Sequence, residues 1–332
     1  MKKFISIIAG SILIFLIAVI SFLSIKGHET HRFNNLISAE ITNIEPNLKV
    51  DLKTIKIKID LKKFSLFFST LNPAVSYQGV NLPIEQSKIY INFAEIFKSK
   101  ANISRIEIKA NVLEIEKIKK LAVRIKPSNF KSFLLNNVSS GTIQSKLDLD
   151  FDRSFKATRY KISGIVKNTN LKIFDNINIA NTKFNFIADN NLVLLNSISA
   201  KIKSIPVSNG SIKINRQNGI LIEGSLNTKI KIDDDGIKMI LPDLKNSNIL
   251  KNKVKINGNF LHKFDINLSK TLELKNYNYN FNGKIDEAKL NLAQSLNSDF
   301  LKNPIEKISF NKTLVKFDAT KGKKNKLFLD GN

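Results

Sequence analysis

Residues 55–62 have the sequence Ile-Lys-Ile-Lys-Ile-Asp-Leu-Lys, in which apolar and charged residues alternate strictly. Successive side chains of a β-strand point to opposite faces, so this stretch predicts a strand with one apolar face and one face in water. The same alternation recurs toward the C-terminus, for example in residues 147–151, 161–167 and 264–268. A short run of the same kind, Leu121, Val123 and Ile125, predicts a further strand. The body of the chain is therefore predicted to be almost entirely strand.

Short turn sequences separate many of these segments. They are Ser139 to Gly141, Asn190-Asn191, Asn209-Gly210, Asn218-Gly219 and Asp235-Gly236. These residue types adopt positive φ in tight turns, and strands joined by tight turns run antiparallel. The fold class expected is mainly β, with a long antiparallel sheet.

Helical segments are few. Phe33, Leu36, Ile37 and Ile41 are spaced by three and four, which predicts a short amphipathic helix within residues 28–43 that ends before Pro46. Further candidates are residues 92–98, residues 127–135 and, the longest, residues 286–301.

Upstream of the strands, residues 4–25 contain no charged residue over 22 positions. As a helix they would extend roughly 33 Å, enough to cross a bilayer core. We expect a transmembrane anchor within residues 1–26, and Lys2 and Lys3 favour a cytoplasmic N-terminus. A cleaved signal peptide is the alternative, but there is no A-x-A-like site near Ile25. The residues assigned to the anchor are Phe4, Ile8, Ile12, Phe15, Val19, Phe22 and Ile25.

Residues 27–332 are expected to form one continuous domain, because no linker-like composition divides them. A weaker second boundary lies near Lys126-Pro127.

The composition excludes several kinds of chemistry. The chain has no cysteine, so disulfides, thiolate metal sites and cysteine nucleophiles are excluded. Asp148, Asp150 and Asp152 alternate with apolar residues and should form a solvated face, and the run Asp233 to Gly236 resembles a polar turn. His28 and His31 are three residues apart but have no further ligands nearby in the sequence. We therefore expect no enzyme activity, no cofactor and no metal site.

The chain is strongly basic, with 53 Lys+Arg against 28 Asp+Glu and a net charge of +25. Such a charge suits nucleic acid or anionic lipid headgroups, and it can also follow from a biased Lys/Ile/Asn composition. Nucleic-acid binding is not expected, because the phenylalanines fall mostly on the apolar side of the alternation, whereas lysines occur on every strand.

The order of these segments resembles a known family. The apolar segment 4–25, the short helix through residues 36–43, the strand of residues 52–61 and the segment 89–115 together resemble the N-terminal part of the AsmA-like family. This family of inner-membrane-anchored proteins is related to the TamB and YhdP proteins and to the chorein-type bridge lipid transporters. The resemblance implies a periplasmic β-sheet curved into an open, apolar groove (a β-taco), a role in moving phospholipid toward the outer membrane, and partner proteins of the periplasm or outer membrane.

A sheet with one apolar face and few helices must cover that face with itself or with a ligand. Acyl chains fit such a groove, because each buried CH₂ contributes about 0.8 kcal/mol without directional contacts. The alternative is a closed β core in an envelope tether or an assembly factor for outer-membrane proteins. The residues assigned to the lipid groove are Ile57, Ile59, Ile89, Ile91, Ile106, Ile108, Leu147, Leu149, Ile212, Ile214, Val254, Ile256, Phe264 and Ile266.

Overall fold

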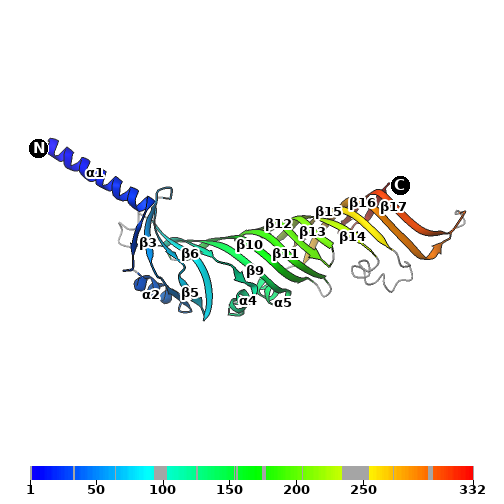
Figure 1. The fold of residues 1–332 in the computed structure, drawn as a ribbon, viewed down its shortest axis with the longest axis horizontal. Helices are drawn as coiled ribbons and strands as arrows, with labels where there is room; N and C mark the ends of the chain where they lie inside the picture. The colour runs from blue at the N-terminus through cyan, green and yellow to red at the C-terminus, as the bar shows by residue number, and fades with distance from the viewer. Residues whose placement is uncertain are drawn as a thin grey trace. The chain divides into compact units, whose positions relative to one another are not determined.

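The computed structural model of the chain describes residues 2–32, 34–63, 65–92, 103–124, 126–152, 154, 156–173, 177–203, 205–233, 254–271, 273–297 and 302–331. The described residues form one open antiparallel sheet of 18 strands with few helices (Figure 1), which confirms the predicted mainly β class. The helices are α1 (Lys2–Ile25), α2 (Asn34–Ile44), α4 (Ile115–Arg124) and α5 (Asn129–Asn137).

The strands are β1 (His28–Thr30), β2 (Leu48–Asp51), β3 (Ile55–Asp60), β4 (Ser65–Leu71), β5 (Ala74–Tyr77), β6 (Val80–Asn92), β7 (Ile103–Ala110), β8 (Leu113–Glu114), β9 (Val138–Phe151), β10 (Ala157–Ile173), β11 (Ile177–Asp189), β12 (Leu192–Ile202), β13 (Ile205–Asn215), β14 (Ile220–Ile232), β15 (Lys255–Leu268), β16 (Leu274–Leu296), β17 (Ile305–Thr320) and β18 (Lys326–Asp330).

The chain divides into two compact units. Unit 1 comprises Met1–Pro127 and Ile143–Gly164, and unit 2 comprises Ser128–Thr142 and Ile165–Asn332. The paired strands β9 and β10 contribute residues to both units.

In unit 1, β1, β3, β4, β6, β7 and β9 pair in this order. The long strand β6 also has a second partner: its first residues pair with β5, which pairs with β2, whereas its later residues pair with β4. The sheet is interrupted where β4 gives way to β5, at Asn72 and Pro73, because Pro73 has no N–H to donate to the ladder. Asn72 has a positive φ of 46° there, and its N–H bonds to Glu85 O at 2.8 Å.

The helix α2 covers one side of this interruption and contacts β2. Its first residue, Asn34, donates from Nδ2 to Leu52 O at 2.6 Å and to Lys53 O at 2.9 Å, the two residues that follow β2. The segment predicted as one helix over residues 28–43 is therefore only partly helical. Its first residues form β1, because they pair with β3.

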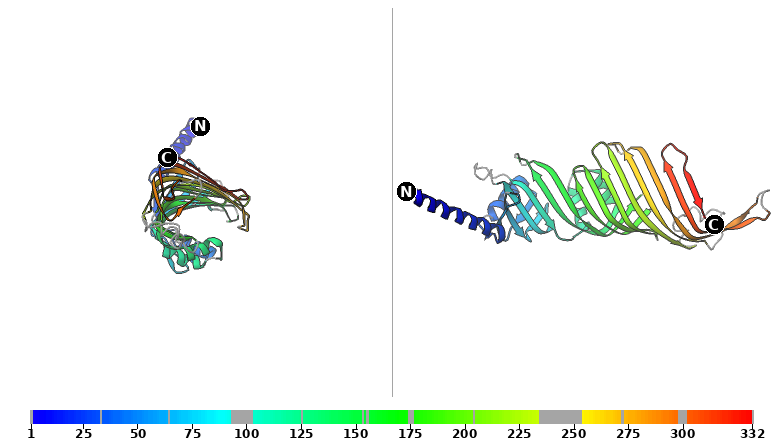
Figure 2. Two further views of the ribbon diagram at one scale, coloured as in Figure 1. Left: turned by 90° about the vertical axis from the view of Figure 1, so that its right-hand side faces the viewer. Right: turned by 90° about the horizontal axis from the view of Figure 1, so that it is seen from above.

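In unit 2, strands β11 to β18 pair antiparallel in chain order and lie side by side in a single layer (Figure 2). Turns at Asn190-Asn191 and Asn218-Gly219 connect successive strands as predicted, and Gly219 has a φ of +109°.

Two other predicted turns are wrong: Gly141 lies inside β9 and Asn209 lies inside β13. Both residues do adopt positive φ, but within their strands, and at Asn209 the strand register shifts as it does at a β-bulge. Asn168, Asn181 and Ser197 in β10, β11 and β12 also have positive φ. Some of these positions contact the next strand: Thr169 packs on Gly141, Asn170 Oδ1 accepts from Asn181 N at 3.0 Å, and Ile198 packs on Gly210. A bulge bends its strand and increases its twist, so the register shift at Asn209 bends β13.

Two secondary-structure predictions are also wrong. Leu121 and Val123 belong to helix α4, in which Ile115 and Ala122 are buried, so the apparent alternation was part of a helical pattern. Residues 286–296 are strand, not helix, because β16 pairs with β15 as far as Lys289 and with β17 as far as Leu296. Asp286 has no partner in the register, so Ile285 and Ala288 lie on the same face of the strand. Their spacing of three residues resembles the spacing of apolar residues in a helix.

The helix predicted at residues 127–135 is confirmed as α5. Its N-cap Ser128 accepts from Lys131 N at 3.1 Å. The candidate helix after Asn92, which ends β6, and the turn at Asp235-Gly236 lie outside the described residues.

Candidate functional site: an apolar helix, an apolar cavity and an apolar sheet face

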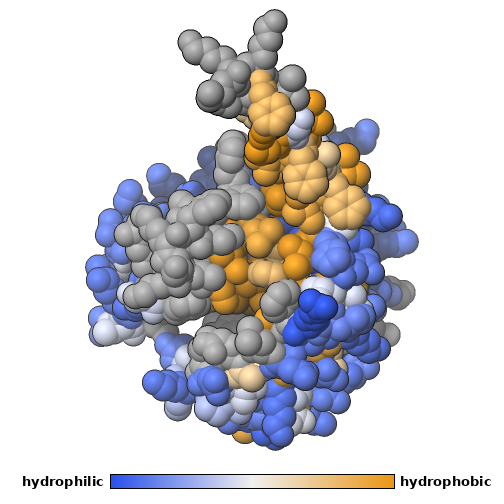
Figure 3. Space-filling view, turned by 90° about the vertical axis from the view of Figure 1, so that its left-hand side faces the viewer, coloured by the Kyte–Doolittle hydropathy of each residue, from blue (hydrophilic) through white to orange (hydrophobic). Residues whose placement is uncertain are grey.

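The helix α1 exposes apolar side chains on all sides. The predicted anchor residues are all exposed, from 36% for Val19 to 79% for Ile25. Of the helices in the described part of the chain, α1 is the one long and apolar enough to cross a membrane. Figure 3 shows hydrophobic side chains along this helix and in a patch beneath it, with hydrophilic side chains on either side.

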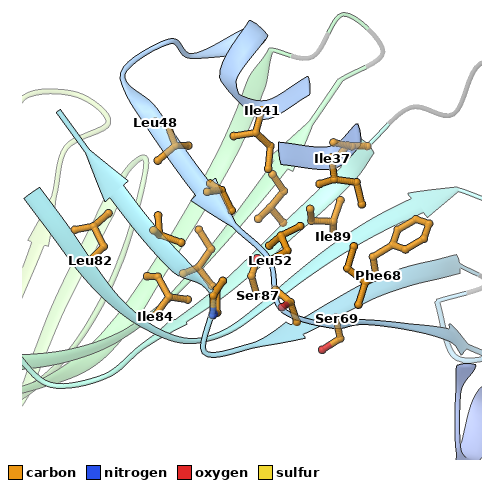
Figure 4. Close-up of a pocket in the computed structure, with 18 of the residues that line it drawn as sticks. Ile37, Ile41, Leu48, Leu52, Phe68, Ser69, Leu82, Ile84, Ser87 and Ile89 are labelled. Carbon is orange, nitrogen blue, oxygen red and sulfur yellow. The ribbon is translucent and has the colours of Figure 1, made fainter. Parts of the chain in front are cut away.

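Unit 1 encloses an apolar cavity of about 290 Å³. It lies where β2 and β5 turn away from β3 and β4, and α2 closes one side with Ile37 and Ile41 (Figure 4). Its lining is almost wholly aliphatic or aromatic, and Glu45 is the one ionisable residue among the described residues that line it. The lining residues are Ile37, Ile41, Glu45, Leu48, Val50, Leu52, Ile55, Phe68, Ser69, Thr70, Pro73, Val75, Leu82, Ile84, Ser87, Ile89, Ile103, Ile106, Ile108 and Phe151.

Three of the predicted groove residues, Ile89, Ile106 and Ile108, line this cavity. The strand register places the others of unit 1 on the same face of the sheet without bringing them into the cavity lining. Ile57 and Leu149 share a row with Ile89 and Ile106. Ile59 and Ile91 share the next row, and Leu147 pairs with Ile108.

Sequence reasoning missed the part of the lining that α2, β2 and β5 contribute. The spacing of Ile37 and Ile41 predicted a helix, but nothing local showed that this helix would close a cavity. The cavity depends on the break at Pro73 and on pairing between segments distant in the chain, which alternation alone does not reveal.

The other face of unit 1 is charged. Arg105 contacts Glu107 at 3.2 Å and Asp148 at 2.9 Å, and Lys63 contacts Glu107 at 3.0 Å. Burial raises the pKa of Glu107, but Lys63, Lys146 and Arg105 outweigh this effect and hold the pKa below its usual range. Asp148 and Asp150 belong to this ion-pair network, opposite the apolar face, whereas Asp152 caps a turn by accepting from Ser154 N and Lys156 N.

In unit 2, one face of the sheet is apolar across successive strands. Ile214, Ile222, Ile266 and Tyr277 form one row of directly paired residues, and Ile212, Gly224, Phe264 and Tyr279 form the next. This apolar sheet face therefore includes the predicted residues Ile212, Ile214, Phe264 and Ile266, all half-buried. Val254 and Ile256 lie in a small core around Ile232.

A polar row crosses the apolar sheet face. His262 Nε2 lies 2.8 Å from Thr228 Oγ1, and His262 Nδ1 lies 2.8 Å from the Tyr279 hydroxyl. The imidazole also lies 5.0 Å from the ring centre of Phe281. Burial lowers the pKa of His262 and raises the pKa of Tyr279. The sequence carried no signal for this row, because it depends on the register of three strands.

The histidines near α1 are exposed, and His31 Nδ1 lies 2.7 Å from Lys53 O. Within the part of the chain that the structure describes, no group of three or more His, Cys, Asp or Glu side chains is placed to hold a metal ion. Comparison of the chain with protein-family models, with curated proteins and with solved structures finds no match.

Proposed function

We propose that the chain is an inner-membrane-anchored protein of the AsmA-like type that carries phospholipid along apolar surfaces of its periplasmic body toward the outer membrane. In this proposal α1 spans the inner membrane with its N-terminus in the cytoplasm. The observation that carries the proposal is the apolar cavity of unit 1. Its volume is about 290 Å³, and of the described residues that line it, Glu45 alone is ionisable.

The chemistry of this cavity suits an acyl chain. Protein ligand sites typically measure about 300–1,000 Å³, so the cavity is close to the lower end of that range. Cavities lined by Leu, Ile and Phe remain dry and bind apolar molecules. Each CH₂ group transferred into such a site contributes about 0.8 kcal/mol without fixing its position, so a chain can slide. No catalytic group is needed for this task.

The second candidate is a tether or assembly factor whose apolar faces pack on each other in a closed core. The open sheet favours transport over this candidate, because apolar side chains such as Ile212 and Ile266 remain half-exposed in unit 2. A closed core would bury them against a second layer.

Mass spectrometry of lipid that copurifies with the full chain in mild detergent tests the proposal. We expect phospholipid with the wild-type protein and much less with Ile108→Asp, because a carboxylate in the cavity disfavours acyl chains. The matched control is Lys109→Asp, which places the same group on the opposite face of β7. Absence of phospholipid from the wild-type protein, or equal loss in both variants, would contradict the proposal.

A further inference from the structure

The residues at the end of α1 pack against strand β3. The helix closes with Lys26 N and Gly27 N both donating to Phe22 O at 2.9 Å, and Gly27 has a φ of +77°, as a glycine after a helix often has. A Cβ added to Gly27 would lie 2.7 Å from Lys58 Cγ and 3.2 Å from Lys56 Cγ. The side chains of these two lysines therefore pack against the chain two residues beyond the apolar helix.

Lys56 and Lys58 belong to an open hollow of about 520 Å³ on the charged face of unit 1. Its ionisable residues are four lysines, Lys53, Lys56, Lys58 and Lys88, and one glutamate, Glu29, which gives a formal charge of +3. We call this site the lysine hollow. It lies on the opposite face of β3 from Ile55, which lines the apolar cavity.

The lysines are held close together with too few counter-charges. In the register, Lys56 and Lys88 both pair with Ser69, so they lie two strands apart with only a small side chain between them. Glu29 contacts Lys56 at 3.0 Å. Among the described residues, no carboxylate oxygen lies within 4.0 Å of the ammonium groups of Lys53, Lys58 or Lys88. Lys88 instead lies 5.6 Å from the ring centre of Phe67.

Like charges in such positions repel one another, and an anion would relieve that repulsion. The position of the hollow identifies the source of the anion. An anionic bilayer surface attracts lysines within a Debye length, about 10 Å at ordinary salt. The side chains of two of these lysines pack against Gly27, two residues beyond the apolar helix.

We propose that the lysine hollow binds the phosphate of an anionic phospholipid in the bilayer that α1 spans. The inference rests on the proposed membrane anchor but not on lipid transport. Headgroup binding on this face would hold unit 1 against the membrane surface, and it would leave the apolar cavity on the other face of the same strands free for acyl chains.

Native mass spectrometry of the delipidated full chain tests the inference, with dioleoyl phosphatidylglycerol and dioleoyl phosphatidylcholine as the two probes. The test variant is Lys53→Gln/Lys58→Gln/Lys88→Gln. The control is Lys229→Gln/Lys263→Gln/Lys284→Gln, which removes three exposed lysines from unit 2. The control is similar in geometry too, because Lys229 in β14 and Lys284 in β16 lie two strands apart, as do Lys58 in β3 and Lys88 in β6.

We expect the wild-type chain and the control to retain phosphatidylglycerol in preference to phosphatidylcholine. In the test variant this preference should fall by about ten-fold or more, because each lysine near an anionic surface adds to the affinity for the anionic lipid. Equal loss in the control, or no preference in the wild-type chain, would overturn the inference. So would displacement of phosphatidylglycerol by excess inorganic phosphate, because the hollow would then be a site for free anions.

Alkaline carbonate extraction of membranes containing the wild-type chain separates this inference from the anchor on which it rests. Release of the chain would contradict the anchor. Retention in the membrane without a preference for phosphatidylglycerol would contradict the lysine hollow alone.

Discussion

The ring of Phe264 in β15 lies directly over Gly224 of the paired strand β14, on the apolar sheet face of unit 2. A Cβ on Gly224 would clash with the ring atoms Cε1, Cε2 and Cζ. Glycine is therefore required here by the close approach of the ring, because its φ lies outside the left-handed region. The ring covers backbone that would otherwise be exposed and fills a position that has no side chain of its own.

Gly224→Val should destabilise unit 2, because the added methyl groups would displace the Phe264 ring. Overpacking of this kind costs about 1–3 kcal/mol. The control is Lys229→Val, which places the same side chain at an exposed position of the same strand and should change stability by less than about 0.5 kcal/mol. Chemical unfolding in detergent measures both. Equal stability of the two variants would show that the Phe264 ring can move away from residue 224 without a loss of unfolding free energy.

Ser87→Phe should reduce the amount of copurified phospholipid while leaving the chain folded. Ser87 lines the apolar cavity, so the larger side chain would occupy space that is otherwise free for a ligand. Ser76→Phe is the matched control, because Ser76 follows the cavity-lining residue Val75 in β5 and points to the other face. Lipid mass spectrometry of both variants, together with a thermal melt, makes the comparison. Undiminished lipid in Ser87→Phe would mean that the cavity does not hold it.

Arg105→Gln should lower the free energy of unfolding by about 1–3 kcal/mol, because it removes a hydrogen bond to the Asp148 carboxylate and an ion pair with the buried Glu107. Arg105 contacts Glu107 and Asp148, whose side chains are only 10% and 17% exposed. Lys213→Gln removes an exposed ion pair with Glu223 and should cost less than about 1 kcal/mol. Chemical unfolding measures the loss of stability in each variant. If the two losses were equal, the partial burial of the Arg105 network would contribute nothing to the free energy of unfolding.

His262 should make stability depend on pH. Burial lowers its pKa in the folded chain below the ordinary value of about 6.5, so the unfolded chain binds the proton more readily. Its contribution to stability is therefore complete above about pH 6.5 and declines as the pH falls toward the lowered pKa. Unfolding free energies at pH 7 and pH 5.5 should differ less in His262→Phe than in the wild-type chain. An unchanged difference would assign the pH dependence to other groups.

Much of the strand pattern could be predicted from sequence because its signal is local. In residues 55–59, isoleucines alternate with lysines, and such alternation depends only on the pleat of a strand. The regular pairing of β3 with β4 confirms this prediction. The prediction failed where the alternation changes phase. Gly141 and Asn209 adopt the positive φ expected of turns but lie inside strands, and the bulge at Asp286 changed a strand pattern into an apparent helical one.

The candidate site was less predictable, because it depends on which distant segments meet. The sequence indicated that Ile89, Ile106 and Ile108 share a face, and the register agrees. It did not indicate that α2, β2 and β5 close a cavity over that face, nor that Thr228, His262 and Tyr279 meet across three strands. Both arrangements follow from pairing between residues far apart in the chain.

Photo-crosslinking in living cells tests most directly whether the apolar surfaces carry phospholipid. A benzophenone amino acid is placed at Ile108 in the cavity and at Ile266 on the apolar sheet face, and at Lys109 and Asp265, the adjacent residues on the opposite faces. The proposal predicts phospholipid adducts at Ile108 and Ile266 and few at Lys109 and Asp265. Equal capture on the two faces, or no lipid adduct at Ile108 and Ile266, would contradict it.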